Sequence, residues 1–237
     1  MKLYEIKNTG TYKTDLSEDQ AIELALAHCK DALKTLDAPI VRGMTEFKNG
    51  YGLIQGEAGA RRSAHTTNYY TTILDASLPP EYPRRSASII CANWKNYSAA
   101  EAYAEEDVYI ILPYDGVKIG ICPEGDLWAV EIKIGKHTET IVSWNEEYEA
   151  LGIHESATFP EIVQSLTNAK AEDPEIAFDV KPGKVKETLI AAYAKPFKLA
   201  TTATPRKYND GVYRELWIGG KCVAISEKNF KSFRNKL

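Results

Sequence analysis

The sequence contains neither a long apolar run nor a recognisable export signal. No segment approaches the roughly eighteen apolar residues that a membrane-spanning helix needs, and the opening Met1–Ile6 lacks the long apolar core of a signal peptide. These absences argue against an integral membrane protein and against a secreted one. We therefore expect a cytoplasmic protein that makes no use of a membrane.

Metal and disulfide motifs are also missing. The four cysteines, Cys29, Cys91, Cys122 and Cys222, are far apart and form no C-x-x-C pair, which argues against a zinc site and a disulfide framework. The four histidines are equally scattered, so no metal site is predicted. The cysteines are expected to be buried free thiols.

An excess of positive charge is the third missing feature. The chain has 29 Lys and Arg against 33 Asp and Glu, a formal charge of -4, whereas a surface that binds nucleic acid needs a clear excess or stripe of cations. What the chain does have is length and apolar content. With 237 residues, of which 44% are hydrophobic and 10% aromatic, it can bury the core of one domain that spans residues 1–237.

Helical periodicity and capping signals predict the first elements. Ser17 and Gln20 have the spacing of a capping box, and apolar residues then recur at helical spacing to about residue 35. Ile40 and Val41 begin a strand that ends at Arg42. The glycine-rich stretch 48–59 is predicted to be a loop. Further elements are expected as a helix at 66–76, a strand at 86–92, a helix at 98–104 and a hairpin at 108–121 around Asp115-Gly116.

The second half of the chain has a mixed pattern. Residues 126–194 are predicted to form an inserted, mainly helical lobe with a strand at 129–134 and helices near 146–151, 159–168 and 184–193. Strand character returns in 212–225, a hairpin-like segment around Gly219-Gly220 with Glu215 at its mouth.

Three short fragments carry residue types suited to a nucleotide. Arg42 offers a planar set of donors for phosphate, and Gly43 lets a ligand approach the backbone. Ser86 and Ser88 are two apart, so on a strand their hydroxyls share a face and can hold a ribose. Glu215 precedes an apolar run, and a buried carboxylate can stabilise the positive charge that develops when a glycosidic bond breaks. Each fragment also has an ordinary interpretation, as a surface arginine, a solvated strand face and an exposed strand-edge glutamate.

Taken in this order, Arg42-Gly43, Ser86-Ala87-Ser88 and Glu215-Leu216-Trp217-Ile218 resemble the mono-ADP-ribosyltransferase family. The family has an arginine and glycine on its first core strand, a Ser-x-Ser strand in the middle and a glutamate that begins a late strand. The resemblance covers about a third of the chain and leaves residues 126–194 unaccounted for.

The resemblance implies NAD as the substrate and assigns roles to individual residues. Arg42 would contact the phosphates, Ser88 would orient the carboxylate and the nicotinamide ribose, and Glu215 would hold the ribose 2-hydroxyl. Tyr69 and Tyr70 are candidates to stack on the nicotinamide ring, with core packing as the alternative for one of them. Arg62 is a candidate second phosphate ligand, against the alternative of a solvated loop.

One departure from the family affects the acceptor. Members that modify arginine carry an acidic residue two positions before the catalytic glutamate, and here that position is Tyr213. Arginine is therefore not the expected acceptor. Ala87 replaces the central residue of a Ser-Thr-Ser strand, a change that costs little because it faces away from the ligand.

The resulting expectation is a mixed α+β fold with two small facing, antiparallel-rich sheets around a cleft, plus the helical insertion. Its function would be to cleave the nicotinamide–ribose bond of NAD and transfer ADP-ribose to a macromolecular acceptor such as a host protein. Compact size and the unfamiliar lobe are similar in style to viral and bacterial effectors, which act in the host cytoplasm. NAD hydrolysis by water, a catalytically inactive nucleotide- or partner-binding protein on the same fold, and a structural protein with coincidental motifs are the alternatives.

Overall fold

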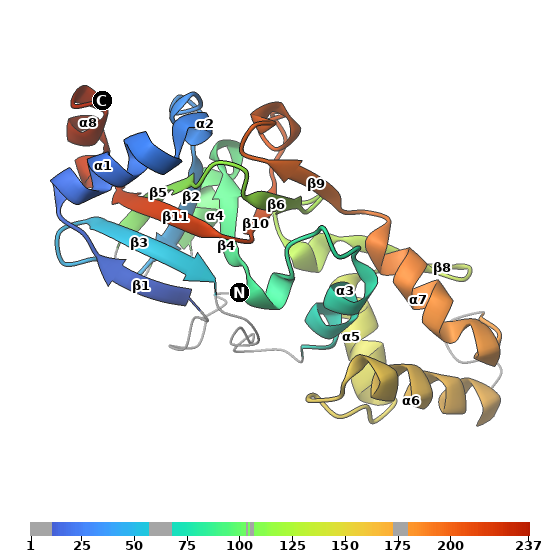
Figure 1. Cartoon of the computed structure of the whole chain (residues 1–237). Coiled ribbons are helices and arrows are strands. Elements are labelled where there is room, and N and C mark those ends of the chain that lie inside the picture. Colours follow the sequence, from blue (N-terminus) through green and yellow to red (C-terminus); the bar gives the residue numbers. More distant parts are fainter. Residues whose placement is uncertain (1–10, 57–67, 103, 105–106, 173–179) are drawn as a thin grey trace.

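A computed structural model describes residues 11–56, 68–102, 104, 107–172 and 180–237. These residues form one large antiparallel sheet with helices on its outer side and a lobe at one end (Figure 1). The large sheet has nine strands in the order β1-β3-β11-β5-β2-β4-β10-β6-β9, and a separate two-stranded sheet pairs β7 with β8. The antiparallel, mixed α+β character predicted from the sequence is confirmed.

Five strands make the first half of the large sheet. Each pairs antiparallel with its neighbour, and β11, from near the end of the sequence, lies between β3 and β5. The bounds are β1 Thr11–Asp15, β3 Tyr51–Gly56, β11 Lys221–Ser226, β5 Asp107–Pro113 and β2 Ile40–Met44.

Four strands make the second half, which joins the first half through a narrow seam. The bounds are β4 Ile89–Asn93, β10 Glu215–Ile218, β6 Lys118–Ile121 and β9 Lys198–Thr201. At the seam, β2 and β4 share only two residue pairs, Ile40 with Asn93 and Val41 with Ala92. The two halves are therefore one continuous sheet with a weak junction, and the predicted pair of separate sheets is wrong.

The inner face of the sheet is filled with its own side chains. Alternate residues of strands from β3 to β9, including Ile54, Ile111, Leu216 and Ile119, form one buried cluster. Gly56 at the end of β3 lies against the Ala87 carbonyl just before β4, although three strands separate β3 from β4 in the sheet, so the sheet curls. Packed apolar side chains line its inner face.

Helices cover the outer face of the first half. Helices α1 (Glu18–His28), α2 (Lys30–Leu33) and α8 (Glu227–Asn235) lie over β3, β11 and β5 (Figure 1). Helix α1 begins where the sequence predicted, because Ser17 and Gln20 form the expected capping box. Helix α4 (Tyr97–Ala102) packs on the outer side of the seam, against Val41 and Ala92.

The described residues between 126 and 194 are mainly helical and form a lobe that packs on the outer face of the second half. It contains β7 (Glu131–Ile134), β8 (His137–Thr140), α5 (Ile141–Ala150), α6 (Phe159–Glu172) and α7 (Val185–Ala194). Helix α3 (Tyr69–Ser77), from much earlier in the chain, joins it. Trp217 of β10 belongs to the same buried cluster, so the lobe and the sheet share a core.

Several predicted local structures are wrong in an instructive way. The predicted loop 48–59 contains strand β3. Both predicted hairpins fail: a turn does form at Asp115-Gly116, but β5 pairs with β11 and β2 while β6 pairs with β10 and β9. Likewise β10 and β11, on either side of Gly219-Gly220, pair with different strands. In each case pairing with distant strands overrides the local turn signal.

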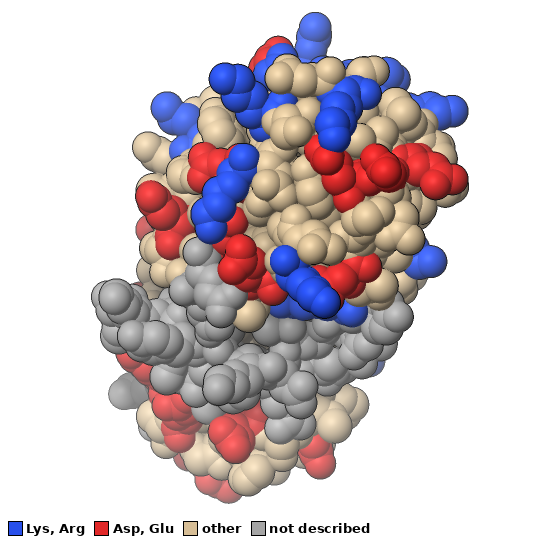
Figure 2. Space-filling view, turned by 90° about the vertical axis from the view of Figure 1, so that its left-hand side faces the viewer, with Lys and Arg blue, Asp and Glu red and all other residues tan. Residues whose placement is uncertain are grey.

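The surface carries charges of both signs. On the side shown in Figure 2, basic and acidic side chains are interspersed. Ion pairs at the protein surface include Arg234 with Asp37 at 2.7 Å and Lys34 with Asp31 at 2.8 Å. Within the described ranges, no helix combines the length and the apolar character that crossing a bilayer requires.

Candidate functional site

Glu215 is the first residue of β10, and its strand partners fix the direction of its side chain. It pairs with Ala92 of β4, which in turn pairs with Val41 of β2. Residues directly opposite each other in an antiparallel pair share a face, so the three side chains lie on the outer side of the sheet. Glu215 therefore points toward the helical lobe.

The two carboxylate oxygens of Glu215 have different surroundings. Oε1 accepts a hydrogen bond from the indole Nε1 of Trp217 at 2.6 Å and lies 3.4 Å from Nη2 of Arg85. Oε2 faces the backbone amide of Leu127 at 3.4 Å, a distance at which a hydrogen bond is weak. Oε1 is thus held firmly, while Oε2 retains capacity to accept another hydrogen.

Arg85 is a buried cation enclosed by aromatic rings. Its guanidinium lies 5.0 Å from the centroid of Tyr70 and 5.9 Å from that of Trp217, within the range of cation–π attraction. It also faces the Tyr70 hydroxyl at 3.4 Å and the Thr71 hydroxyl at 3.3 Å. The side chain is 7% exposed, so these contacts hold it in one place beside Glu215.

A short turn carries a second carboxylate into this region. The turn η3 (Leu127–Ala129) follows Asp126, whose Oδ1 accepts a hydrogen bond from the Trp128 amide at 3.0 Å. The same turn supplies the Leu127 amide that faces Glu215. Burial, together with the negative charge of Glu215, raises the pKa of Asp126, although the Trp128 amide and Arg85 act in the opposite direction.

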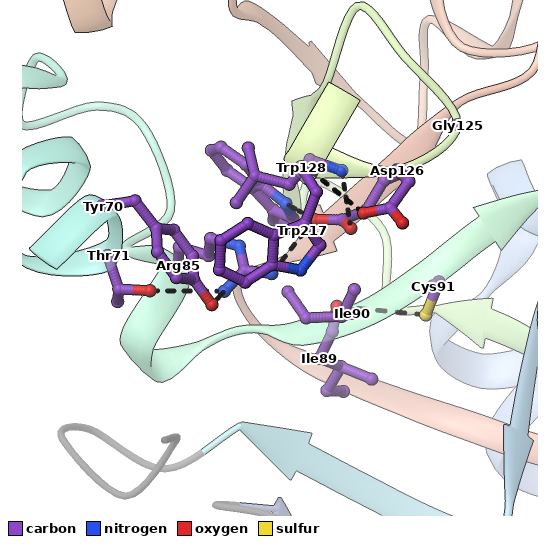
Figure 3. Close-up of polar contacts among 12 residues, drawn as sticks. Tyr70, Thr71, Arg85, Ile89, Ile90, Cys91, Gly125, Asp126, Trp128 and Trp217 are labelled. Atoms are coloured by element: carbon purple, nitrogen blue, oxygen red, sulfur yellow. Dashed lines mark hydrogen bonds and ion pairs between the residues drawn. The ribbon is translucent and has the colours of Figure 1, made fainter. Parts of the chain in front are cut away.

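Figure 3 shows how these side chains gather: Asp126 lies beside Trp128 and Trp217, with Tyr70, Thr71 and Arg85 grouped next to them. Asp126, Trp128 and Glu215 are only partly buried, whereas Tyr70, Arg85 and Trp217 are buried. We call these six residues the Glu215 site. It combines two carboxylates that solvent can reach with a fixed cation and aromatic rings behind them.

Arg42 does not belong to the Glu215 site. It is next to Val41 on β2, so its side chain points to the inner face, away from Glu215. There it is 6% exposed, and its Nη1 donates to the backbone carbonyl of Ile90 just where β2 separates from β4. The expectation that Arg42 meets Glu215 in one pocket is therefore wrong in geometry, because the two side chains occupy opposite faces of the sheet.

Ser86 and Ser88 do not share the face of a strand. Ser86 lies in the turn η1 (Arg85–Ala87), and β4 begins only after Ser88. The Ser88 hydroxyl donates to the Arg84 carbonyl at 2.6 Å and is buried. Ser88 precedes the Ile89–Ile218 pair, at the opposite end of β4 from the pair that holds Glu215, so about 13 Å of strand separates the two levels. Ser88 closes a turn and does not orient Glu215.

Gly43 allows close packing of a helix, and no space for a ligand is left beside it. A Cβ placed on Gly43 would meet the Ala100 carbonyl oxygen at 2.1 Å and the Ala104 amide nitrogen at 2.4 Å. Glycine is therefore needed so that α4 and the segment after it can pack against β2. The predicted ligand approach at this position is blocked by the protein backbone.

The two tyrosines have separate roles, and one candidate lies elsewhere. Tyr69 is buried, its hydroxyl donates to the Ile153 carbonyl, and its ring packs on Tyr148, so it is a core residue of the lobe. Tyr70 belongs to the Glu215 site, where its ring centroid lies 4.7 Å from that of Trp128. Arg62 lies outside the described residues.

Sequence reasoning missed Arg85, Asp126, Trp128 and the polar role of Trp217. The only sequence signal for Trp217 is that it lies two residues after Glu215 on a strand, hence on the same face. Arg85 and Asp126 come from turns, where no periodicity reports the direction of a side chain. The four cysteines are buried and free, as predicted, and the described residues contain no cluster of three metal-binding side chains.

Comparison with protein-family models finds no match, and no curated protein or solved structure matches the chain either.

Proposed function

We propose that the protein is an NAD-dependent ADP-ribosyltransferase whose essential carboxylate is Glu215. In the reaction, the bond between the nicotinamide nitrogen and the ribose carbon breaks, and its electron pair returns to the pyridine ring. An acceptor then bonds to the ribose carbon. Glu215 holds the ribose 2-hydroxyl and stabilises the positive charge that develops on the sugar.

The main support for this proposal is that the two carboxylate oxygens of Glu215 have different hydrogen-bond partners. Oε1 is fixed by the Trp217 indole at 2.6 Å and by Arg85, so the carboxylate cannot rotate freely. Oε2 has a single long contact among the described residues, at 3.4 Å. An orientated carboxylate with one oxygen available is what binding a ribose hydroxyl requires.

Aromatic residues support a flat, cationic ligand at this place. Trp128 is partly exposed and lies in the same turn that contacts Glu215. Its outer face can stack on a nicotinamide ring, which gains from both contact area and cation–π attraction. Tyr70 backs Trp128 from the buried side and keeps it in position.

The arrangement of the motif-bearing strands also supports the proposal. Strands β2, β4 and β10 are consecutive neighbours in the sheet although they come from distant parts of the chain. This neighbourhood agrees with the motif resemblance at the level of strands. The residue roles differ, since the arginine beside the glutamate is Arg85 and Arg42 stays on the inner face.

Nicotinamide release from NAD by the purified chain, with and without cell extract, tests the proposal. Glu215→Gln keeps the size and shape of the side chain and removes the charge. We expect it to lower the release rate by at least about 100-fold while NAD binding is retained. Glu131→Gln, an exposed carboxylate on β7, serves as the matched control and should retain full activity.

Two outcomes would contradict the proposal. Absence of nicotinamide release by the wild-type chain under all acceptor conditions would exclude the enzyme and favour a nucleotide- or partner-binding protein. Unchanged turnover in Glu215→Gln would exclude Glu215 as the essential carboxylate. NAD hydrolysis without any transfer would identify the related glycohydrolase reaction, in which water is the acceptor.

A further inference from the structure

We propose that Asp126 is the general base of the reaction and that the acceptor presents a neutral O–H group. This inference rests on the proposed function, because it assigns the acceptor chemistry of the same site. It starts from the presence of two carboxylates in one site with different partners.

Glu215 and Asp126 are held by one turn but bound differently. The Leu127 amide faces Glu215, and the next amide in the chain, that of Trp128, donates to Asp126. Arg85 and the Trp217 indole are both on Glu215. Glu215 is therefore the carboxylate with a direct cationic partner, whereas Asp126 accepts its hydrogen bond from the Trp128 backbone amide.

This difference separates the roles of the two groups. A carboxylate that a fixed cation and an indole hold in one orientation suits the stabilisation of positive charge on the sugar. A carboxylate that is partly buried next to another negative charge binds a proton more readily. Two such groups with divergent environments are the usual arrangement for a stabiliser and an acid or base.

Charged and polar groups face Asp126 from three neighbouring elements. They are Glu215 on β10, Arg85 on η1, and the amide of Trp128 on η3; burial and Glu215 raise its pKa, while the amide and Arg85 lower it. The nearby Cys122 thiol is buried, and its pKa is raised well above the ordinary value, so it stays protonated and does not compete as a base.

As the C–N bond breaks and its electrons pass to nicotinamide, the acceptor oxygen forms a bond to the ribose carbon. The proton of that oxygen passes to a carboxylate oxygen of Asp126 and then to solvent. The products are nicotinamide, an O-linked ADP-ribosyl group and one proton.

The nature of the base limits the acceptor. A guanidinium acceptor is served, in the family that the motifs resemble, by an acidic residue two positions before the glutamate, and here that position is Tyr213. An anionic acceptor has no proton to give. Water and alcohols have an O–H that needs a base only as the new bond forms. The site is therefore suited to a hydroxyl acceptor.

The test uses water and methanol as acceptors and compares Asp126→Asn with the wild-type chain. We expect the wild type to release nicotinamide and to give both ADP-ribose and its methyl glycoside when methanol is added. Asp126→Asn should lower kcat by about 100-fold for both products, with KM for NAD changed by less than about threefold. The acidic limb of the kcat–pH profile should disappear in this variant.

Two controls separate catalysis from structural damage. Glu124→Gln removes an exposed carboxylate two residues away and should leave kcat and the pH profile unchanged. Added formate should restore part of the activity of Asp126→Ala, because a small carboxylate can occupy the space left by the side chain.

The outcomes distinguish this inference from the proposed function. A wild-type chain that releases nicotinamide while Asp126→Asn keeps the same kcat and pH profile would overturn the role of Asp126 alone. So would failure of formate to rescue Asp126→Ala, or ADP-ribose found on guanidinium or thiol groups of extract proteins. A wild-type chain that never releases nicotinamide would instead refute the function itself.

Discussion

Arg85 and Glu215 are separated by 130 positions in the sequence, and their side chains form an ion pair of 3.4 Å. The pair joins the turn before β4 to the start of β10. Both side chains are largely buried, at 7% and 12% exposed, so water screens the charges poorly. The ion pair therefore helps to fix the geometry of the Glu215 site, together with the hydrogen bond from the Trp217 indole.

Replacing Arg85 should have a large effect on stability. Arg85→Met removes the cation and leaves the Glu215 carboxylate partly buried without it, a change that costs about 3–5 kcal/mol in comparable buried pairs. Arg234→Met breaks the exposed pair with Asp37 and should cost no more than about 1 kcal/mol. Urea unfolding of the two variants measures the difference. If both variants lost the same small amount of unfolding free energy, the Arg85–Glu215 pair would not stabilise the site.

Arg42 should affect stability without affecting NAD. Its guanidinium donates to the Ile90 carbonyl on the inner face, and Arg42→Met leaves that buried carbonyl without this donor, at a cost of about 1–3 kcal/mol. NAD affinity, measured by titration calorimetry on the folded variant, should stay within about twofold of the wild-type value. If Arg42→Met lost much of its NAD affinity and kept the stability of the wild type, Arg42 would have to contact NAD.

The indole of Trp217 should be needed for catalysis beyond its packing. Trp217→Phe removes the Nε1 donor that lies 2.6 Å from Glu215 Oε1, so the carboxylate can rotate and kcat should fall about tenfold or more. Trp144→Phe is the matched control, because Trp144 is also buried and its indole donates to the Ile132 carbonyl at 2.9 Å. Both variants should lose stability, and only Trp217→Phe should lose nicotinamide release. Equal kcat values in the two variants would reduce Trp217 to a packing role.

The sequence predicts a helix or strand well where the element's own residues carry the signal, such as a capping box or helical periodicity. Ser17 and Gln20 begin α1 as expected, and α6 and α7 lie within a few residues of the predicted ranges. It fails at β3, where glycines look like a loop signal. Gly52 is needed because the Phe47 ring occupies the space of its missing side chain, and Gly56 because the Ala87 carbonyl does. Such long-range contacts leave no periodic trace.

In the Glu215 site, too, the sequence predicts features that depend on neighbouring residues and misses contacts between residues far apart in the chain. Glu215 could be found because its position at the start of a late apolar strand fits the motif resemblance. The arginine partner of Glu215 could not be found, because no pattern in the sequence shows where the side chains of Arg42, Arg84 and Arg85 point. Arg84 binds backbone carbonyls at the end of α3, Arg42 faces inward, and Arg85 reaches Glu215.

The pH dependence of stability should reveal the environment of Asp126. Its pKa is raised from the ordinary value of 3.8, chiefly by burial. Between that value and the raised one the folded state binds more protons than the unfolded state, so the contribution of Asp126 to stability falls as the pH rises through this window. Asp126→Asn has no titrating group at this position, so this contribution to the pH dependence of stability is absent from the variant.

The free energy of unfolding of Asp126→Asn, relative to the wild type, should therefore be more favourable at pH 7 than at pH 4. Urea unfolding at several pH values measures this difference, and Glu124→Gln is the control, since an exposed carboxylate should give a flat comparison. A difference that decreases with rising pH would mean that Asp126 is stabilised in its charged form, as in a structural ion pair. Such a group would be a poor base near neutral pH, so the stability measurement tests the catalytic assignment without any substrate.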